Sequence, residues 1–190
     1  MRNRGSRTTQ QWRRAAGRWR AVAVVAVALA AVAASNTGSA ATAASAGYVP
    51  TAACNAAIPL PYPPQQGNGY QVVLGVVAVP AFVAQRAYPS GLTGPWRFFD
   101  KQGLFVQAGS PAVVVSVPNA WRKRVAIGWA NASSPVSVQR VASCSQPPGA
   151  WNGWPGGYYL RTSTPLCAPL VVRVGRQTAT VRVGIGRSCG

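Results

Sequence analysis

Short apolar runs separated by turn-forming residues fill the chain from residue 69 onward. In two of these runs every second residue is apolar, so that these side chains share one face, as in a half-buried strand. The runs are rich in β-branched residues, and Gly, Pro, Asn and Ser stand between them, which is typical of an all-β domain. The alternating positions are Val113, Val115 and Val117 in one run and Val125, Ile127 and Trp129 in the other.

The pattern predicts nine strands, of which the last two form the clearest hairpin. Gly175-Arg176 is a two-residue turn that places Val174 opposite Gln177. In this register Arg173 and Arg182 point outward, while the apolar residues between them point inward. The nine strands are expected over residues 70–79, 96–100, 104–108, 112–117, 124–130, 136–144, 158–162, 169–174 and 177–185.

Three segments depart from simple alternation. A bulge is expected near Arg140, because Val138 and Val141 are both apolar although residues three apart point to opposite faces. One or two helical turns are expected over 81–87, between two prolines, and an extended polyproline arm over 59–64.

The first 46 residues predict a secretory signal peptide. Seven Arg precede an apolar run over 21–34, and Ala-x-Ala cleavage sequences follow at 41–43 and 44–46. The run is shorter than the roughly 20 residues of a membrane span, although an uncleaved signal-anchor stays an alternative. We therefore expect the protein to be secreted or to lie on the extracellular face of the cell envelope.

These observations together predict an all-β protein with a single domain. Its expected fold is an immunoglobulin-like antiparallel β-sandwich of about 7 to 9 strands, preceded by the signal peptide. The expected divisions are the signal over 1–46, a Pro-rich N-terminal arm over 47–68 and the sandwich over 69–190.

The chain is strongly basic because acidic residues are almost absent. The whole chain has a formal net charge of +18, with Asp100 as its single acid and no His. After residue 46, ten Arg and two Lys face that one Asp, which leaves +11. Such a deficit of acids indicates a polyanionic environment or an acidic partner.

Four cysteines in an exported chain indicate two disulfides. Three connectivities are possible, and we favour Cys144 with Cys167 and Cys54 with Cys189. Because the cysteines lack C-x-x-C spacing and the chain has no His, neither a metal nor a cofactor is expected.

Candidate catalytic residues are few, so the protein is predicted not to be an enzyme. Asp100 lacks a His or a second acid with which to exchange protons, and a structural role in an ion pair with Arg97, Lys101 or another Arg is favoured. An enzyme that uses Asp100 or Lys101 is the distant alternative.

Two segments are candidate binding sites. Arg122, Lys123 and Arg124, together with Arg173 and Arg182, would bind an anionic envelope polymer or a membrane surface. Nucleic acid is a poor physiological target for an exported protein. The alternative is a carbohydrate- or protein-binding module on an aromatic Gly/Pro loop, where the rings could equally cap the core. That loop contains Trp151, Trp154 and Tyr158.

Three stretches of the sequence resemble uncharacterised secreted β-sandwich proteins of high-GC bacteria. They are residues 69–80, residues 108–118 with Trp121-Arg-Lys-Arg124, and residues 156–161. The resemblance implies export and a sandwich fold but brings no known activity, site residue or oligomeric state.

Overall fold

The computed structural model describes residues 48–189 apart from 62–63, 65–68, 85, 131–133 and 146–148. The expected signal peptide therefore lies outside the described residues. The rest belongs to one compact unit, and it is all-β apart from two short 3-10 helices, η1 (Cys54–Ala56) and η3 (Asn119–Trp121). Among the described residues, no helix is both long and apolar enough to cross a membrane.

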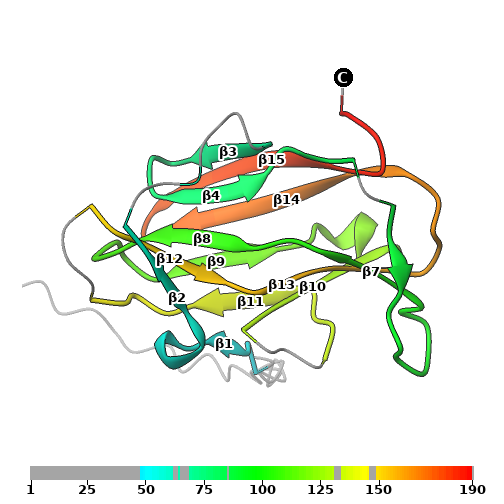
Figure 1. The fold of residues 1–190 in the computed structure, drawn as a ribbon, viewed down its shortest axis with the longest axis horizontal. Coiled ribbons are helices and arrows are strands. Elements are labelled where there is room, and N and C mark those ends of the chain that lie inside the picture. Colours follow the sequence, from blue (N-terminus) through cyan, green and yellow to red (C-terminus); the bar gives the residue numbers. More distant parts are fainter. Residues whose placement is uncertain are drawn as a thin grey trace, which may run out of the picture. The chain divides into compact units, whose positions relative to one another are not determined.

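The strands form three sheets (Figure 1). Sheet A has six strands in the order β1-β11-β9-β14-β15-β5, and it is antiparallel except at its two edge pairs. Its strands are β1 (Thr51–Ala52), β11 (Val138–Val141), β9 (Val113–Ser116), β14 (Leu166–Val174), β15 (Gln177–Ile185) and β5 (Phe82–Val83).

Sheets B and C are both antiparallel. Sheet B has the order β2-β12-β8-β4-β3, and sheet C has the order β10-β13-β7-β6. The strands of sheet B are β2 (Ile58–Leu60), β12 (Trp151–Trp154), β8 (Leu104–Gln107), β4 (Val77–Pro80) and β3 (Tyr70–Val73). Those of sheet C are β10 (Val125–Trp129), β13 (Gly156–Leu160), β7 (Phe98–Lys101) and β6 (Tyr88–Pro89).

A single antiparallel ribbon joins sheets B and C. β7 continues into β8, and β12 continues into β13, with only Gln102-Gly103 and Pro155 between them (Figure 1). The register passes from one sheet to the other without a slip, from Phe98 opposite Leu160 to Gln107 opposite Trp151. We refer to residues 98–107 paired with 151–160 as the ribbon. Sheets B and C are thus two halves of one surface.

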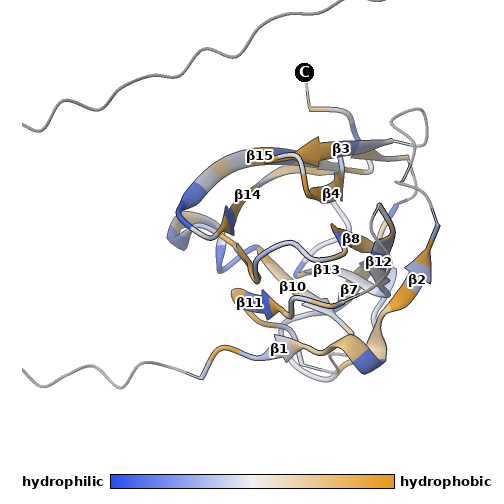
Figure 2. Cartoon of the chain, turned by 90° about the vertical axis from the view of Figure 1, so that its left-hand side faces the viewer, coloured by the Kyte–Doolittle hydropathy of each residue, from blue (hydrophilic) through white to orange (hydrophobic). Residues whose placement is uncertain are grey.

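The three sheets share one hydrophobic core, which their strands surround when the chain is viewed from the end (Figure 2). Sheet A contributes alternate residues of β9 and β14, and the ribbon contributes Leu104, Trp154 and Leu160. Burial of these side chains is the main source of stability, at about 1.5–3 kcal/mol for each large apolar side chain. The alternation predicted for 113–117 is confirmed, because Val113, Val115 and Val117 are buried and the residues between them are half-buried. Over 125–129 the three predicted residues are buried, but the residues between them are buried as well, so both faces of this strand are covered.

The predicted hairpin at Gly175-Arg176 is confirmed. Val174 lies opposite Gln177, and Gly175 has a φ of 56°, which suits its turn. The run over 70–79, in contrast, is not one strand. It is a hairpin of β3 and β4, because Leu74 and Gly75 turn the chain with φ values of 51° and 73°.

Three further expectations were wrong. The described residues of 81–87, which leave out residue 85, form no helix, since β5 pairs with the end of β15. The described part of the arm over 47–68 is not separate from the β domain, because β1 pairs with β11 and β2 pairs with β12. The β domain therefore begins before residue 69. No bulge occurs at Arg140, because β11 pairs regularly with β9.

Gln139 explains why β11 stays regular. Its buried side chain takes the inward position between Val138 and Arg140, where its Oε1 accepts a hydrogen bond from the Trp129 backbone N–H at 3.0 Å. Its Nε2 donates to the Trp129 carbonyl, also at 3.0 Å. The side-chain amide thus takes the place of a peptide group and connects β11 to the edge of β10, two residues beyond the backbone bridge between Ile127 and Val136.

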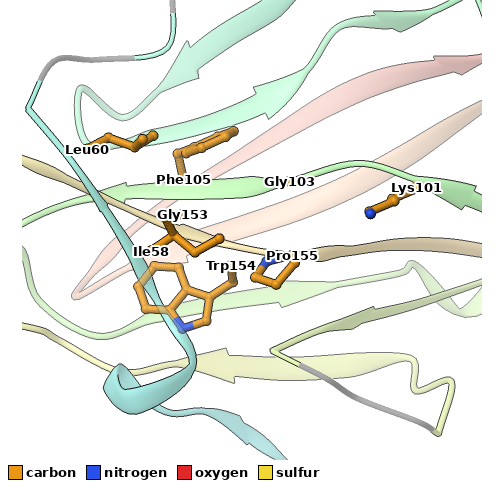
Figure 3. Close-up of a pocket in the computed structure, with 8 residues that line it drawn as sticks. All are labelled: Ile58, Leu60, Lys101, Gly103, Phe105, Gly153, Trp154 and Pro155. Carbon is orange, nitrogen blue, oxygen red and sulfur yellow. The ribbon is translucent and has the colours of Figure 1, made fainter.

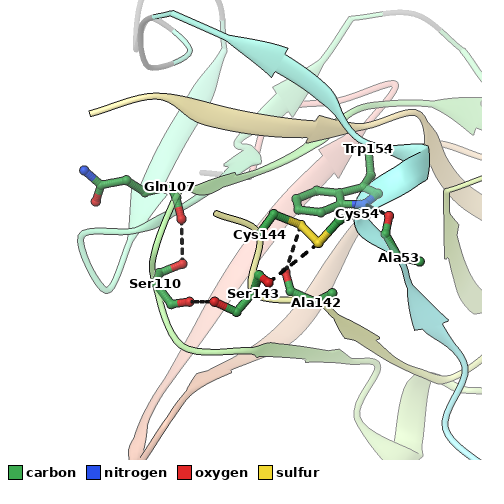
Figure 4. The surroundings of a disulfide bond; sticks show 8 residues. All are labelled: Ala53, Cys54, Gln107, Ser110, Ala142, Ser143, Cys144 and Trp154. Atoms are coloured by element: carbon green, nitrogen blue, oxygen red, sulfur yellow. Dashed lines mark hydrogen bonds between the residues drawn. A yellow bond between two sulfur atoms is a disulfide. The ribbon is translucent and has the colours of Figure 1, made fainter. Parts of the chain in front are cut away.

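The disulfides join Cys54 to Cys144 and Cys167 to Cys189, so the favoured connectivity was wrong. The parallel pair of β1 and β11 brings Cys54 beside Cys144, where the Trp154 indole lies next to the bridge and donates to the Ala53 carbonyl at 2.9 Å (Figure 4). All four cysteines are bridged, as expected, which indicates an oxidising environment.

At the other end of the chain, Cys167 pairs with Gly184 across β14 and β15. The Arg187 carbonyl occupies the place where a Cβ of residue 184 would lie, so that the chain folds back closely over this glycine. This fold-back of the C-terminal segment brings Cys189 next to Cys167. The segment between Cys144 and Cys167 cannot close as a small loop, because it contains β12 and β13, which run on from each other as one extended side of the ribbon.

Peptide mapping tests the disulfides. Trypsin cleaves after Arg140, Arg161, Arg173 and Arg187, so each cysteine falls in a separate peptide. Non-reducing mass spectrometry should find the peptide 141–161 linked to the peptide that contains Cys54, and 162–173 linked to 188–190. A link between 141–161 and 162–173 would contradict the structure. By chain entropy, replacing both cysteines of the longer loop by Ser should cost about 4.5 kcal/mol, against about 3.5 for the shorter one.

A substitution at Gln139 tests its role between the sheets. Gln139→Leu leaves the N–H and the carbonyl of Trp129 without their partners in a dry site, and it should lower the free energy of unfolding by about 2 kcal/mol. Gln177→Leu is the control, since Gln177 is exposed beside the hairpin turn. Denaturant unfolding measures both variants, and equal losses would argue against the bridging role.

Candidate functional site

The outer side of sheet A presents a row of residues that crosses five strands. In order they are Thr51, Arg140, Val114, Arg173 and Thr178, each directly opposite the next. The four polar side chains of the row are exposed. Because neighbouring strands lie about 4.8 Å apart, the two Arg backbones are roughly 10 Å apart on either side of the valine.

Arg182 lies farther along the same side. It is exposed and pairs with Pro169 of β14, two residue pairs beyond Val171 and Thr180. Between it and Arg173, β15 carries only hydroxyl side chains outward, which are Thr178 and Thr180. We refer to the outer side of sheet A with Arg140, Arg173 and Arg182 as the cationic face. Hydrophilic colouring marks the turn of the β14–β15 hairpin in Figure 2.

The cationic face has no acid to neutralise it. Asp100 is the only acidic residue of the chain, and its side chain is buried in the core with 1% of its surface exposed. Repulsion between two Arg charges about 10 Å apart in water amounts to only about 0.4 kcal/mol, and physiological salt screens it further. The fold therefore tolerates these unpaired charges, which stay available for an anion.

The other predicted basic cluster is a separate feature. Arg122, Lys123 and Arg124 are exposed in the turn after η3. Arg122 Nε donates to the Val117 carbonyl at 3.2 Å, and the Arg124 guanidinium stacks over the Trp121 ring at 4.4 Å. Two of these three side chains thus support their own turn.

The predicted aromatic loop does not exist in that form. Trp151 and Trp154 belong to β12, and Tyr158 belongs to β13. Their side chains are buried, with 5%, 1% and 0% of their surfaces exposed. Since stacking on a sugar requires an accessible ring face, these three side chains do not form the exposed aromatic platform that was expected.

Asp100 lies inside the core, opposite Tyr158 on the ribbon. Burial raises the pKa of Asp100 to about 6, while a hydrogen bond from the Gln102 side chain lowers it in part. The Asp100 Oδ2 and the Tyr158 hydroxyl both lack a hydrogen-bond partner among the residues that the structure describes. Burial, and then the nearby Asp100, raise the pKa of Tyr158.

The expected ion pair of Asp100 with Lys101 is not formed. Successive residues of a strand point to opposite faces, and accordingly Asp100 is buried while Lys101 is exposed on the outside of the ribbon. Arg97, the other expected partner, is exposed as well. The same separation prevents the carboxylate and the amine from acting on one substrate.

Arg140 is the member of the cationic face that the sequence analysis missed. Strict alternation along 138–141 would have pointed Arg140 outward, but it also required a polar Gln139 in the core. A bulge was expected instead, because Val138 and Val141 are both apolar. The hydrogen bonds of Gln139 to Trp129, which lies on the preceding strand β10, make the inward position favourable.

Comparison of the chain with protein-family models, with curated proteins and with solved structures found no match.

The buried Asp100 predicts an unusual dependence of stability on pH. Its pKa is raised from 3.8 to about 6 in the folded state, so protonation stabilises the fold fully at low pH, and this contribution is lost as the pH rises through 6. The free energy of unfolding should fall by about 2 kcal/mol between pH 4 and pH 7.

The control is Asp100→Asn, whose amide does not titrate and which should be nearly insensitive to pH over this range. The measurement is clean because the chain has no Glu and no His. Chemical denaturation at a series of pH values gives the comparison. A wild-type stability that stays constant or rises from pH 4 to pH 7 would refute the burial of this carboxyl.

Proposed function

We propose that the protein is an exported, non-catalytic β-sandwich that binds an anionic polymer of the cell envelope through its cationic face. The polymer would be recognised by its repeated phosphate or carboxylate groups. In this proposal Arg140, Arg173 and Arg182 contact the anions, and the neighbouring Thr hydroxyls provide additional hydrogen bonds. The immunoglobulin-like character of the sandwich and the cleavage of the signal belong to the same proposal.

The observation that carries the proposal is the convergence of three unpaired Arg side chains on one open side of a sheet. A guanidinium keeps its charge at any physiological pH and forms bidentate hydrogen bonds with phosphate or carboxylate. The outer side of sheet A is broad, and it offers a chain-like ligand several contacts at once. Repeated weak contacts of this kind are how an extended polyanion is held.

Two other functions receive less support. The carbohydrate- or protein-binding module required exposed rings at Trp151, Trp154 and Tyr158, which are buried. An enzyme that uses Asp100 or Lys101 also receives less support, because the Asp100 side chain is only 1% exposed and lies on the opposite face of the strand from Lys101. The absence of catalysis stays part of the proposal.

A charge-matched pair of triple variants tests the cationic face. Arg140→Gln, Arg173→Gln and Arg182→Gln together should weaken binding to immobilised dextran sulfate and to purified envelope by about 100-fold, at roughly 1 kcal/mol for each lost charge near an anionic surface. Wild-type retention should also fall steeply as salt is added.

The control combines Arg122→Gln, Lys123→Gln and Arg124→Gln, which removes the same net charge from the turn after η3. It should retain most of the binding. Equal losses in both triple variants would mean that binding depends only on net charge and not on the cationic face. Binding that does not respond to salt would reject the proposal.

A further inference from the structure

A shallow groove lies on the outer side of the ribbon, where sheets B and C join. Its volume is about 320 Å³, which falls at the lower end of the range for sites of small ligands. Figure 3 shows Lys101 at one end of the lining and Leu60 near the other. The lining residues are Ile58, Leu60, Lys101, Gly103, Phe105, Gly153, Trp154 and Pro155.

The groove exists because two glycines let Phe105 lie close to the sheet. Phe105 is directly opposite Gly153 on the ribbon. A Cβ at Gly153 would lie 2.7 Å from the Phe105 ring, and one at Gly103 would lie 3.0 Å from it. The edge of Tyr70 meets the same ring, with centroids 5.0 Å apart. Phe105 is thus held between its neighbours, which fixes the shape of the groove.

The lining is apolar along most of its length. Ile58 is 56% exposed, so that an edge strand presents an aliphatic side chain to solvent beside the groove. The Trp154 Nε1–H is already donated to the Ala53 carbonyl at 2.9 Å. The indole itself is buried in the core with 1% of its surface exposed. The carbon surface of the groove therefore comes mainly from Ile58 and Phe105, and a ligand gains mainly by burying that surface.

Lys101 is the one charged residue of the lining. Its side chain is exposed, and the only carboxylate side chain of the protein is buried on the opposite face of the same strand. Among the described residues, the charge of the lining is therefore positive at one end and absent elsewhere. A complementary ligand has an apolar body with an anionic group at one end.

We propose that this groove binds a small single-chain alkyl carboxylate, with the carboxylate on Lys101 and the chain along Phe105, Gly153 and Ile58. The site is separate from the cationic face, and it does not depend on the function proposed for that face. Anchoring by one charge-assisted contact, with the remaining affinity from apolar burial, predicts weak and reversible binding.

The lysines give a direct readout. Lys101 and Lys123 are the only lysines of the chain, so reductive ¹³C-methylation yields two side-chain NMR signals besides the α-amino signal. Decanoate, below its micelle concentration, should shift the Lys101 signal with a saturable isotherm and leave Lys123 unchanged. Decyltrimethylammonium, which has the same tail and the opposite charge, should shift neither. Equal shifts at both lysines, or no shift at Lys101, would overturn the proposal.

Variants of the unmodified protein, measured by calorimetry, test the two halves of the ligand. Lys101→Gln should weaken decanoate binding about fivefold, whereas Lys123→Gln, with the same change of charge, should have no effect. Gly153→Ala should abolish binding, because the new methyl group drives the Phe105 ring into the groove. Should this variant fail to fold, Ile58→Asp on the exposed edge strand serves instead, since its carboxylate repels the ligand.

Two further measurements distinguish decanoate binding in the groove from binding to the cationic face and from binding to a membrane. The triple variant of the cationic face should bind decanoate like the wild type, and a parallel loss would mean that decanoate binds there. Anionic phospholipid vesicles should bind Lys101→Gln as well as they bind the wild type. Binding to vesicles but not to free decanoate, with a loss in Lys101→Gln, would assign the groove to a membrane lipid and overturn the proposal.

Discussion

The unbroken register of the ribbon is the constraint on which the rest of the structure depends. Because residues 98–107 and 151–160 pair without a slip, sheets B and C form one surface opposite sheet A. The same alternation sends Asp100 and Tyr158 into the core and Lys101 and Phe105 to the outside. A shift by one residue would exchange the two sets and place a lysine in the core. The same strand pairing thus determines both the lining of the groove on the outside and the burial of Asp100 on the inside.

The isolation of Asp100 also determines the electrostatics of the surface. Most proteins intersperse acids among their basic residues, and surface ion pairs then occupy part of the Arg side chains. Here the one acid is buried, so the Arg side chains bind to backbone carbonyls, aromatic rings or solvent. A surface of this kind attracts anions over a distance set by the salt concentration, about 8 Å under physiological conditions.

Features that depend on local pattern could be predicted from the sequence. The β14–β15 hairpin follows from a glycine turn between alternating strands, and the outward positions of Arg173 and Arg182 follow from its register. Features that depend on distant segments could not. The segment of Trp151 and Trp154 has the composition of a loop, and it forms a strand because it pairs with β8 in the ribbon. Cys54 lies beside Cys144 only because β1 pairs with β11. The inward position of Gln139 could not be predicted either, although its partner Trp129 is only ten residues away, because it depends on how β10 and β11 lie against each other in space.

The connectivity of the two disulfides has a consequence for the oxidative folding of the chain. Each cysteine is bonded to the next one in the sequence, the first to the second and the third to the fourth. A chain that emerges amino terminus first can therefore be oxidised in the order in which its thiols appear, and no correct bond has to wait for a later one to close inside it. Thiol–disulfide exchange is slow without a catalyst. Consecutive pairing therefore requires no exchange of an early bond for a later one, whereas in a nested connectivity a bond between the first two thiols would have to be exchanged.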